Sequence, residues 1–189
     1  MNIRYFITIT FIIAGLFSGS NAQPLPLKLP YNRMIQPAGR QIFFGDESLE
    51  NHSLDAALSP DGKWLAVEER YSIVFISTTD NTVKFTLANK VLPELRGGMN
   101  TYSGITWHNG KKGPEVLWSC KGRKDTSFVA SAKWDGNKAE FGRLIGYKAI
   151  PPSKLALPNE ILITKESDRV FIYVVLNGNN NLIKQDFLS

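Results

Sequence analysis

The sequence predicts an all-β protein, and more specifically an incomplete β-propeller of about three four-stranded blades whose last blade lacks a strand. Three observations lead to this prediction. Runs of about five to eight β-branched, aromatic and aliphatic residues recur along the chain, separated by Gly, Asn, Asp, Pro and Lys. Apolar positions almost never recur with the spacing of a helix. A pattern of strand, polar turn and strand also returns at intervals, which indicates a repeat architecture.

The first repeat unit, residues 54–88, begins with the apolar strand Leu54–Leu58. The turn Ser59-Pro60-Asp61-Gly62 follows, in which proline presets φ and glycine accepts a positive φ. A short apolar segment, Gln41–Phe44, precedes this unit and is predicted as a strand. The remaining strands of the unit are expected at Lys63–Glu68, Ser72–Ser77 and Thr82–Leu87.

The second and third units, residues 102–144 and 159–187, repeat this order. In the second, Asp135-Gly136-Asn137 is a strong hairpin signal between two strands. In the third, Asn177-Gly178-Asn179-Asn180 sits between the last two predicted strands. The strands of these units are expected at Tyr102–Trp107, Pro114–Cys120, Ser127–Trp134, Lys138–Leu144, Glu160–Thr164, Arg169–Val175 and Asn181–Phe187.

The spacing of the units favours a propeller over its main rival, a β-sandwich. Gly62 and Gly110 occupy corresponding turns and are separated by roughly one 40–50-residue blade period. About four strands in each period are typical of a propeller blade. Regular short strands also fit a sandwich, but that architecture gives no reason for the unit to repeat.

The N-terminus predicts export. Met1–Arg4 is short and basic, Tyr5–Phe17 is almost entirely apolar, and Ser18–Ala22 is small and polar. This order is typical of a secretory signal peptide, residues 1–22, with cleavage before Gln23. The mature protein is then secreted or periplasmic, and a retained membrane anchor is the alternative. Residues 23–38 are rich in proline and are expected to form an extended linker before a globular region that starts near residue 39.

Composition argues against two further interpretations. The formal charge is +5 and the basic residues are scattered, so no concentrated basic surface is expected and nucleic acid is not a predicted partner. Cys120, the single cysteine, cannot form an intramolecular disulfide. It ends the apolar run Val116-Leu117-Trp118, so we expect a small buried residue on a strand. Catalysis by Cys120 would need a cation or a histidine such as His108 beside it.

The residues from Leu54 to Val67 form an apolar strand, a Ser-Pro-Asp-Gly-Lys turn and a second apolar strand that ends in valine. This order resembles the repeat of YVTN-type β-propellers. The segment Asp168–Asn180 is similar to the same repeat, including its Leu-Asn-Gly-Asn loop. The middle unit departs from it, with Trp107-His108-Asn109-Gly110 in place of the usual turn. The resemblance spans about Leu54 to Phe187.

The resemblance implies an exported bacterial propeller and leaves its activity open. The family includes secreted surface proteins, lactonase-like enzymes and binding domains, and some members continue into a C-terminal metal-dependent phosphoesterase domain. The chain is expected to correspond to the N-terminal part of such a protein, because a closed ring needs four to eight blades. The alternative expectation is a ring completed by self-association through the open edges of the blades.

Few residues suggest a ligand site. Asp46, Glu50 and His52 fall close together before the first unit, and His108 ends a strand at a blade turn. These four residues are the candidate ligand contacts, although a solvated loop and a hydrogen-bonded turn are the more common reasons for such residues at these places. The segment has neither the spacing of a calcium loop nor a zinc motif, and no nucleophile elbow or nucleotide fingerprint occurs. No catalytic residue, metal site or cofactor is therefore predicted.

These observations favour an exported propeller that acts as a binding or interaction module for an unidentified ligand or protein. The alternative is the propeller part of a hydrolase, either a lactonase-like enzyme or the parent of a metal-dependent phosphoesterase. That alternative comes from the resemblance alone, and a shared fold does not imply a shared activity.

Overall fold

The computed structural model describes residues 27–28, 34–35, 39–110 and 113–187. The predicted signal peptide and most of the predicted linker lie outside these residues. The chain divides into two compact units, Met1–Gln41 and Ile42–Ser189. In the first unit, the described residues form a pair of short antiparallel strands, β1 (Leu27–Lys28) and β2 (Met34–Ile35).

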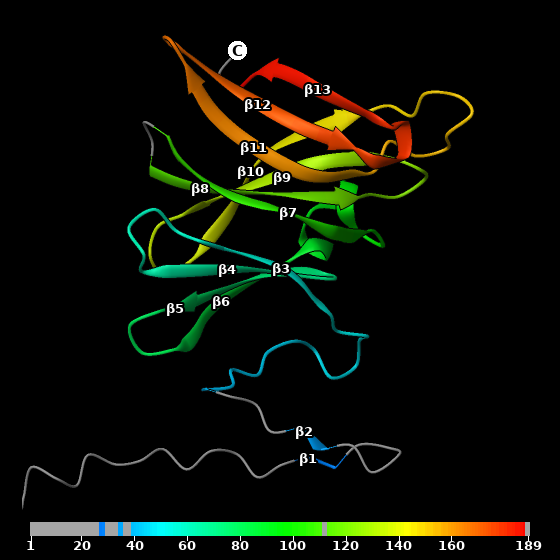
Figure 1. Ribbon diagram of the computed structural model, residues 1–189. Helices are drawn as coiled ribbons and strands as arrows, with labels where there is room; N and C mark the ends of the chain where they lie inside the picture. The colour runs from blue at the N-terminus through cyan, green and yellow to red at the C-terminus, as the bar shows by residue number, and fades with distance from the viewer. Residues whose placement is uncertain (1–26, 29–33, 36–38, 111–112, 188–189) are drawn as a thin grey trace, which may run out of the picture. The chain divides into compact units, whose positions relative to one another are not determined.

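The second unit contains three antiparallel sheets, which we call blades 1, 2 and 3 (Figure 1). Within each blade, neighbouring strands follow one another in the chain. Blade 1 consists of β3 (Ser53–Leu58), β4 (Trp64–Glu69), β5 (Ser72–Ser77) and β6 (Thr82–Ala88). Blade 2 consists of β7 (Met99–Gly110), β8 (Gly113–Lys121), β9 (Ser127–Trp134) and β10 (Ala139–Tyr147). Blade 3 consists of β11 (Pro158–Glu166), β12 (Arg169–Leu176) and β13 (Asn181–Asp186).

This arrangement confirms the predicted all-β, incomplete propeller, with sheets of four, four and three strands among the described residues. The first strands of the blades are neighbours in space, because β7 lies against both β3 and β11. Short 3₁₀ turns complete the connections, at η2 (Asn89–Val91), η3 (Pro93–Leu95) and η4 (Asn177–Asn179). The segment Gln41–Phe44, by contrast, forms no strand.

The turn between β3 and β4 shows why its sequence specifies a tight reversal. The hydroxyl of Ser59 donates to a carboxylate oxygen of Asp61 at 2.6 Å, and accepts from the backbone N–H of Trp64 at 2.9 Å. Asp61 also accepts from the backbone N–H of Lys63 at 3.1 Å. Gly62 has φ +71°, a conformation that side chains rarely adopt. The turn therefore satisfies its own polar groups and fixes the register of the two strands.

Blades 1 and 2 are joined by aromatic packing. The ring of Phe75 stacks on that of Trp134 with centroids 4.4 Å apart, and Trp64 meets Trp134 edge to face at 5.0 Å. Trp118, on β8, is fully buried in the same cluster. Large aromatic side chains contribute most of the apolar area at such an interface. These three tryptophans thus lie between the two sheets.

The opposite face of blade 2 packs against blade 3. Leu117 and Val129 point away from blade 1 and join a cluster that includes Ile161, Ile172 and Val174. The alternation of side chains along a strand accounts for this, since Leu117 and Trp118 must face opposite sides of the sheet. A sheet covered on both faces needs apolar residues at consecutive positions, as in the run that ends at Cys120.

The outer face of blade 1 is covered by the segment that was predicted as a strand. Ile42 and Phe44 pack against Val67, Val74 and Ile76. The prediction of a strand at Gln41–Phe44 was wrong because Ile42 and Phe44 pack on the face of a sheet. They do not pair with a strand edge.

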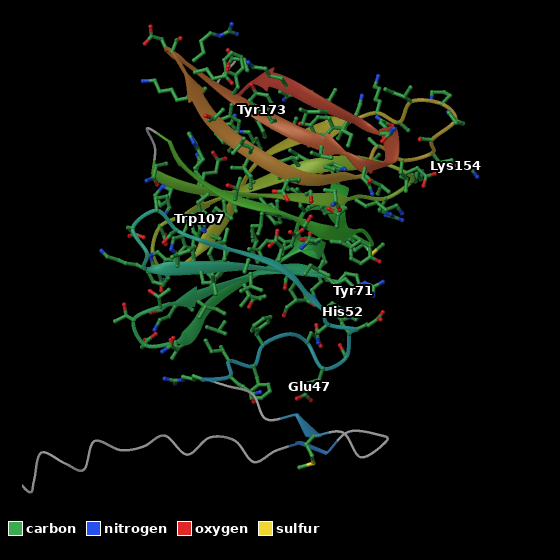
Figure 2. The ribbon with its side chains drawn as sticks, in the orientation of Figure 1. Glu47, His52, Tyr71, Trp107, Lys154 and Tyr173 are labelled. Atoms are coloured by element: carbon green, nitrogen blue, oxygen red, sulfur yellow. The ribbon has the colours of Figure 1, made fainter. Side chains whose placement is uncertain are left out.

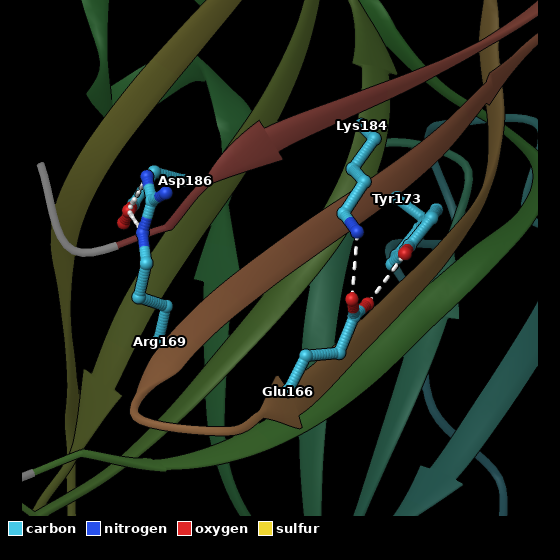
Figure 3. Close-up of polar contacts among 5 residues, drawn as sticks. All are labelled: Glu166, Arg169, Tyr173, Lys184 and Asp186. Atoms are coloured by element: carbon cyan, nitrogen blue, oxygen red, sulfur yellow. Dashed lines mark hydrogen bonds and ion pairs between the residues drawn. The ribbon is translucent and has the colours of Figure 1, made fainter.

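The outer face of blade 3 carries a charged network over aromatic rings (Figure 3). Glu166 accepts from the Tyr173 hydroxyl at 2.5 Å and from the Lys184 ammonium at 2.6 Å. The same ammonium lies 4.2 Å from the centroid of the Phe171 ring, within range of a cation–π contact. A lysine on β13, the last strand, is a common way to discourage pairing with another chain.

A buried carboxyl group also lies between the blades. Glu68, on β4, is fully buried, and within the described part of the chain neither of its carboxyl oxygens has a hydrogen-bond partner. Burial, with smaller contributions from the charges of Asp55 and Glu160, raises the pKa of Glu68 to about 9. The carboxyl group is therefore protonated at neutral pH, because ionisation inside the apolar interface is costly.

This burial predicts a stability that depends on pH. The pKa of Glu68 is higher in the folded protein than its usual value of 4.5, so its contribution is complete below pH 4.5 and is lost as the pH rises to about 9. Glu68→Gln should remove this loss, and its stability relative to wild type should improve by roughly 3 kcal/mol between pH 4.5 and pH 7. Urea unfolding of both proteins across this pH range measures the difference.

Glu94→Gln, at an exposed position, is the matched control for the loss of one carboxylate. A difference between Glu68→Gln and wild type that stays constant from pH 4.5 to pH 8.5 would contradict the prediction.

Candidate functional site

A pocket of about 540 Å³ opens where the first strands of all three blades begin. We call it the inner-strand pocket. Leu54 follows the start of β3, Met99 to Tyr102 start β7, and Asn159 follows the start of β11. Its walls also include the turn between β4 and β5 and the end of β8. The lining residues are Glu50, His52, Leu54, Arg70, Met99, Asn100, Thr101, Tyr102, Lys121, Leu155, Leu157, Asn159 and Asn177.

Two of the four predicted ligand contacts meet at this pocket. The ring nitrogen Nε2 of His52 lies 3.0 Å from a carboxylate oxygen of Glu50. The other carboxylate oxygen accepts from the guanidinium of Arg70 at 2.6 Å. The hydrogen bond from His52, and then the charge of Arg70, lower the pKa of Glu50. Glu50 is therefore held ionised between a histidine and an arginine.

The strands behind the pocket are tied together by buried polar side chains. The amide of Asn100 donates to the backbone carbonyls of Glu69 at 2.6 Å and Ser72 at 3.1 Å, which connects blade 2 to blade 1. The hydroxyl of Thr101 donates to the carbonyl of Pro158 at 2.7 Å, which connects blade 2 to blade 3. These bonds fix the relative positions of the strand ends, so the pocket has a defined shape.

Asp46 lies outside this pocket. It borders a separate cavity of about 610 Å³, which is formed by blade 1 and the connection between β6 and β7. Its carboxylate accepts from the backbone N–H of Ser48 at 2.9 Å and from the Ser48 hydroxyl at 2.6 Å. These bonds lower the pKa of Asp46. The carboxylate organises its own loop, which is the solvated-loop interpretation that the sequence left open.

His108 lies near the far end of β7, about 20 Å along the strand from Tyr102 at the usual rise per residue. Figure 2 shows His52 at one end of the blades and Trp107, the chain neighbour of His108, toward the other. The ring of His108 meets that of Phe187 edge to face, with centroids 4.9 Å apart. Burial, opposed by the charge of Glu115, lowers the pKa of His108. The four predicted residues thus occupy three separate places.

A cavity of about 770 Å³ lies between blades 1 and 2 at this far end, bordered by Asp61, Trp64, Trp134 and Glu140. It involves only two of the blades. We place the candidate site in the inner-strand pocket instead, because that pocket draws residues from all three blades and contains two of the predicted ligand contacts. Binding sites are typically concave, mostly apolar and supplied with a few convergent polar groups, as this one is.

Sequence reasoning missed several residues of this pocket. Arg70 lies in the turn between β4 and β5, and Lys121 ends β8, so both belonged to a scattered set of basic residues. Tyr102 was assigned to a strand and is 84% exposed. The sequence offered one clue to these residues, which is their place at the ends of predicted strands. Residues at corresponding strand ends of a repeat come together in the fold.

Neither a metal centre nor a membrane span is found among the residues that the structure describes. No three His, Cys, Asp or Glu side chains of these residues are grouped so that they could hold a metal ion. No helix in the same residues is long and apolar enough to cross a membrane.

Comparison with known proteins adds no relative. The sequence matches no family model, no curated protein and no solved structure. The resemblance to YVTN-type propellers therefore stays a prediction.

Cys120 is fully buried on β8, which agrees with its interpretation as a structural residue. Burial raises the pKa of its thiol well above the usual range. At pH 8, we expect the native protein to react with a disulfide reagent such as 5,5′-dithiobis(2-nitrobenzoate) at least about 100-fold more slowly than the urea-unfolded chain. Absorbance of the released thiolate measures both rates, and comparable rates would show that the thiol is accessible in the fold.

Proposed function

We propose that this chain is an exported β-propeller of the YVTN type that acts as a binding module, with its ligand in the inner-strand pocket. The observation that carries the proposal is the convergence of three blades on one mostly apolar pocket that contains a few oriented polar groups. The ion pair between Glu50 and Arg70 and the buried amide of Asn100 are such groups.

The repeat itself supports the family assignment. In blade 1, the turn between β5 and β6 corresponds to the turn between β9 and β10 in blade 2: its Asp80 carboxylate accepts from the backbone N–H of Thr82 at 3.2 Å, and Asn81 has φ +56°. In blade 2, the carboxylate of Asp135 accepts from the backbone N–H groups of Asn137 and Lys138, both at 2.8 Å, and Gly136 has φ +97°. These residue types occur where the geometry needs them, as expected for a true repeat.

Export is tested on the N-terminus of the product. When the full chain is expressed in a bacterium with an outer membrane, we expect the periplasmic fraction to contain a protein that begins at Gln23. N-terminal sequencing and intact mass measure this. Recovery of the protein in the cytoplasm with residues 1–22 still attached would contradict export, and recovery in the membrane fraction would favour the alternative of a retained anchor.

Binding is tested with N-phenyl-1-naphthylamine, an uncharged apolar dye. We expect the purified protein to bind one equivalent with saturable fluorescence. Tyr102→Ser should weaken the affinity about five- to tenfold, because an aromatic contact in a pocket contributes roughly 1 kcal/mol. Phe43→Ser is the matched control, since both aromatic side chains are 84% exposed and only Tyr102 lines the pocket.

Unsaturable binding, or an equal loss of affinity in the two variants, would contradict the proposed site.

A further inference from the structure

We infer that the inner-strand pocket selects an apolar molecule that carries one anionic group, with Lys121 as the residue that neutralises the anion. The inference rests on the proposed binding function and specifies its ligand class. It follows from the polarity of the pocket walls and from the balance of charges at the pocket.

The walls fit an apolar ligand body. Leu54, Leu155 and Leu157 are half-buried side chains that line the pocket, and Met99 is 37% exposed and Tyr102 84% exposed there. Five apolar side chains, from blade 1, blade 2 and the connection between blades 2 and 3, thus line one space. A hydrocarbon or aromatic body would remove this surface from water, which is favourable in proportion to the area covered.

The charges at the pocket do not cancel. Arg70 and Lys121 are the two permanent cations among the lining residues, and Glu50 is the one carboxylate. Glu50 is already engaged by Arg70 at 2.6 Å and by His52 at 3.0 Å. Lys121 has no ion pair or side-chain hydrogen bond among the described residues. Lys121, a half-buried residue, therefore brings a cationic group without a counter-charge to a mostly apolar pocket.

Such an ammonium group favours an anion of matched size. A lysine beside an apolar surface gains more from a carboxylate, sulfonate or phosphate than a lysine surrounded by water does, because water screens the interaction less. A cationic ligand would instead meet Lys121 with no free carboxylate opposite it. The pocket therefore discriminates by charge at one end and by apolar contact over the rest.

The test uses two dyes that differ by one charged group. 8-Anilinonaphthalene-1-sulfonate carries the naphthyl and phenyl rings of N-phenyl-1-naphthylamine together with a sulfonate. We expect Lys121→Gln to weaken binding of the sulfonate about tenfold, the usual size of a charge-assisted contact, and to change binding of the neutral dye less than twofold. Lys121→Arg, which keeps the charge, should retain most of the affinity for the sulfonate.

Lys133→Gln is the matched control, because Lys133 is exposed on β9, lines a different cavity and changes the net charge equally. It should leave both affinities unchanged. Equal effects of Lys121→Gln and Lys133→Gln on the sulfonate would overturn the inference, as would an equal effect of Lys121→Gln on both dyes. Thermal unfolding of each variant confirms that the fold is retained.

The two proposals fail in different ways. If Tyr102→Ser weakens both dyes and Lys121→Gln weakens neither, the pocket stands and its preference for anions is wrong. If neither substitution affects either dye, the proposed binding site itself is wrong.

Discussion

Blade 2 lies between two other sheets, and this burial on both faces shapes most of the structure. The strand β8 must present Trp118 to blade 1 and Leu117 to blade 3, so its central residues are apolar without interruption. The stacked rings of Phe75 and Trp134 fill one interface, and aliphatic side chains fill the other. Because each blade has its own meander of hydrogen bonds, this packing is what holds the blades together.

The same packing explains the state of these polar side chains at the interfaces, which are either hydrogen-bonded or uncharged. Asn100 and Thr101 donate to carbonyls of neighbouring blades, and each thereby satisfies a buried group while fixing the distance between two sheets. Glu68 has no such partner, and burial keeps it protonated. Blade 3 differs, because its outer face is exposed and carries Glu166 and Lys184 over aromatic rings. Among the described residues, no further sheet packs on this face of blade 3, and charged side chains occupy it instead.

The inner-strand pocket is a consequence of this stacking. Each blade begins its first strand at the same end, so the starts of β3, β7 and β11 meet there. The segment before β3 brings Glu50 and His52, and the turn after β4 brings Arg70. The ends of stacked sheets cannot pack as closely as their centres. A pocket can therefore form at the strand ends without any additional domain.

The sequence by itself determined the strands, the turns and the repeat, because these depend on neighbouring residues. Alternation, proline and glycine placed most of the strands within a few residues of their observed limits, and the turn at Ser59 to Gly62 followed from local chemistry. Tertiary structure decided which strand ends meet. It joined Glu50 and His52 with Arg70 and Lys121, left Asp46 and His108 elsewhere, and turned a predicted strand near Phe44 into a lid. These outcomes depend on contacts between residues far apart in the chain, which no local pattern encodes.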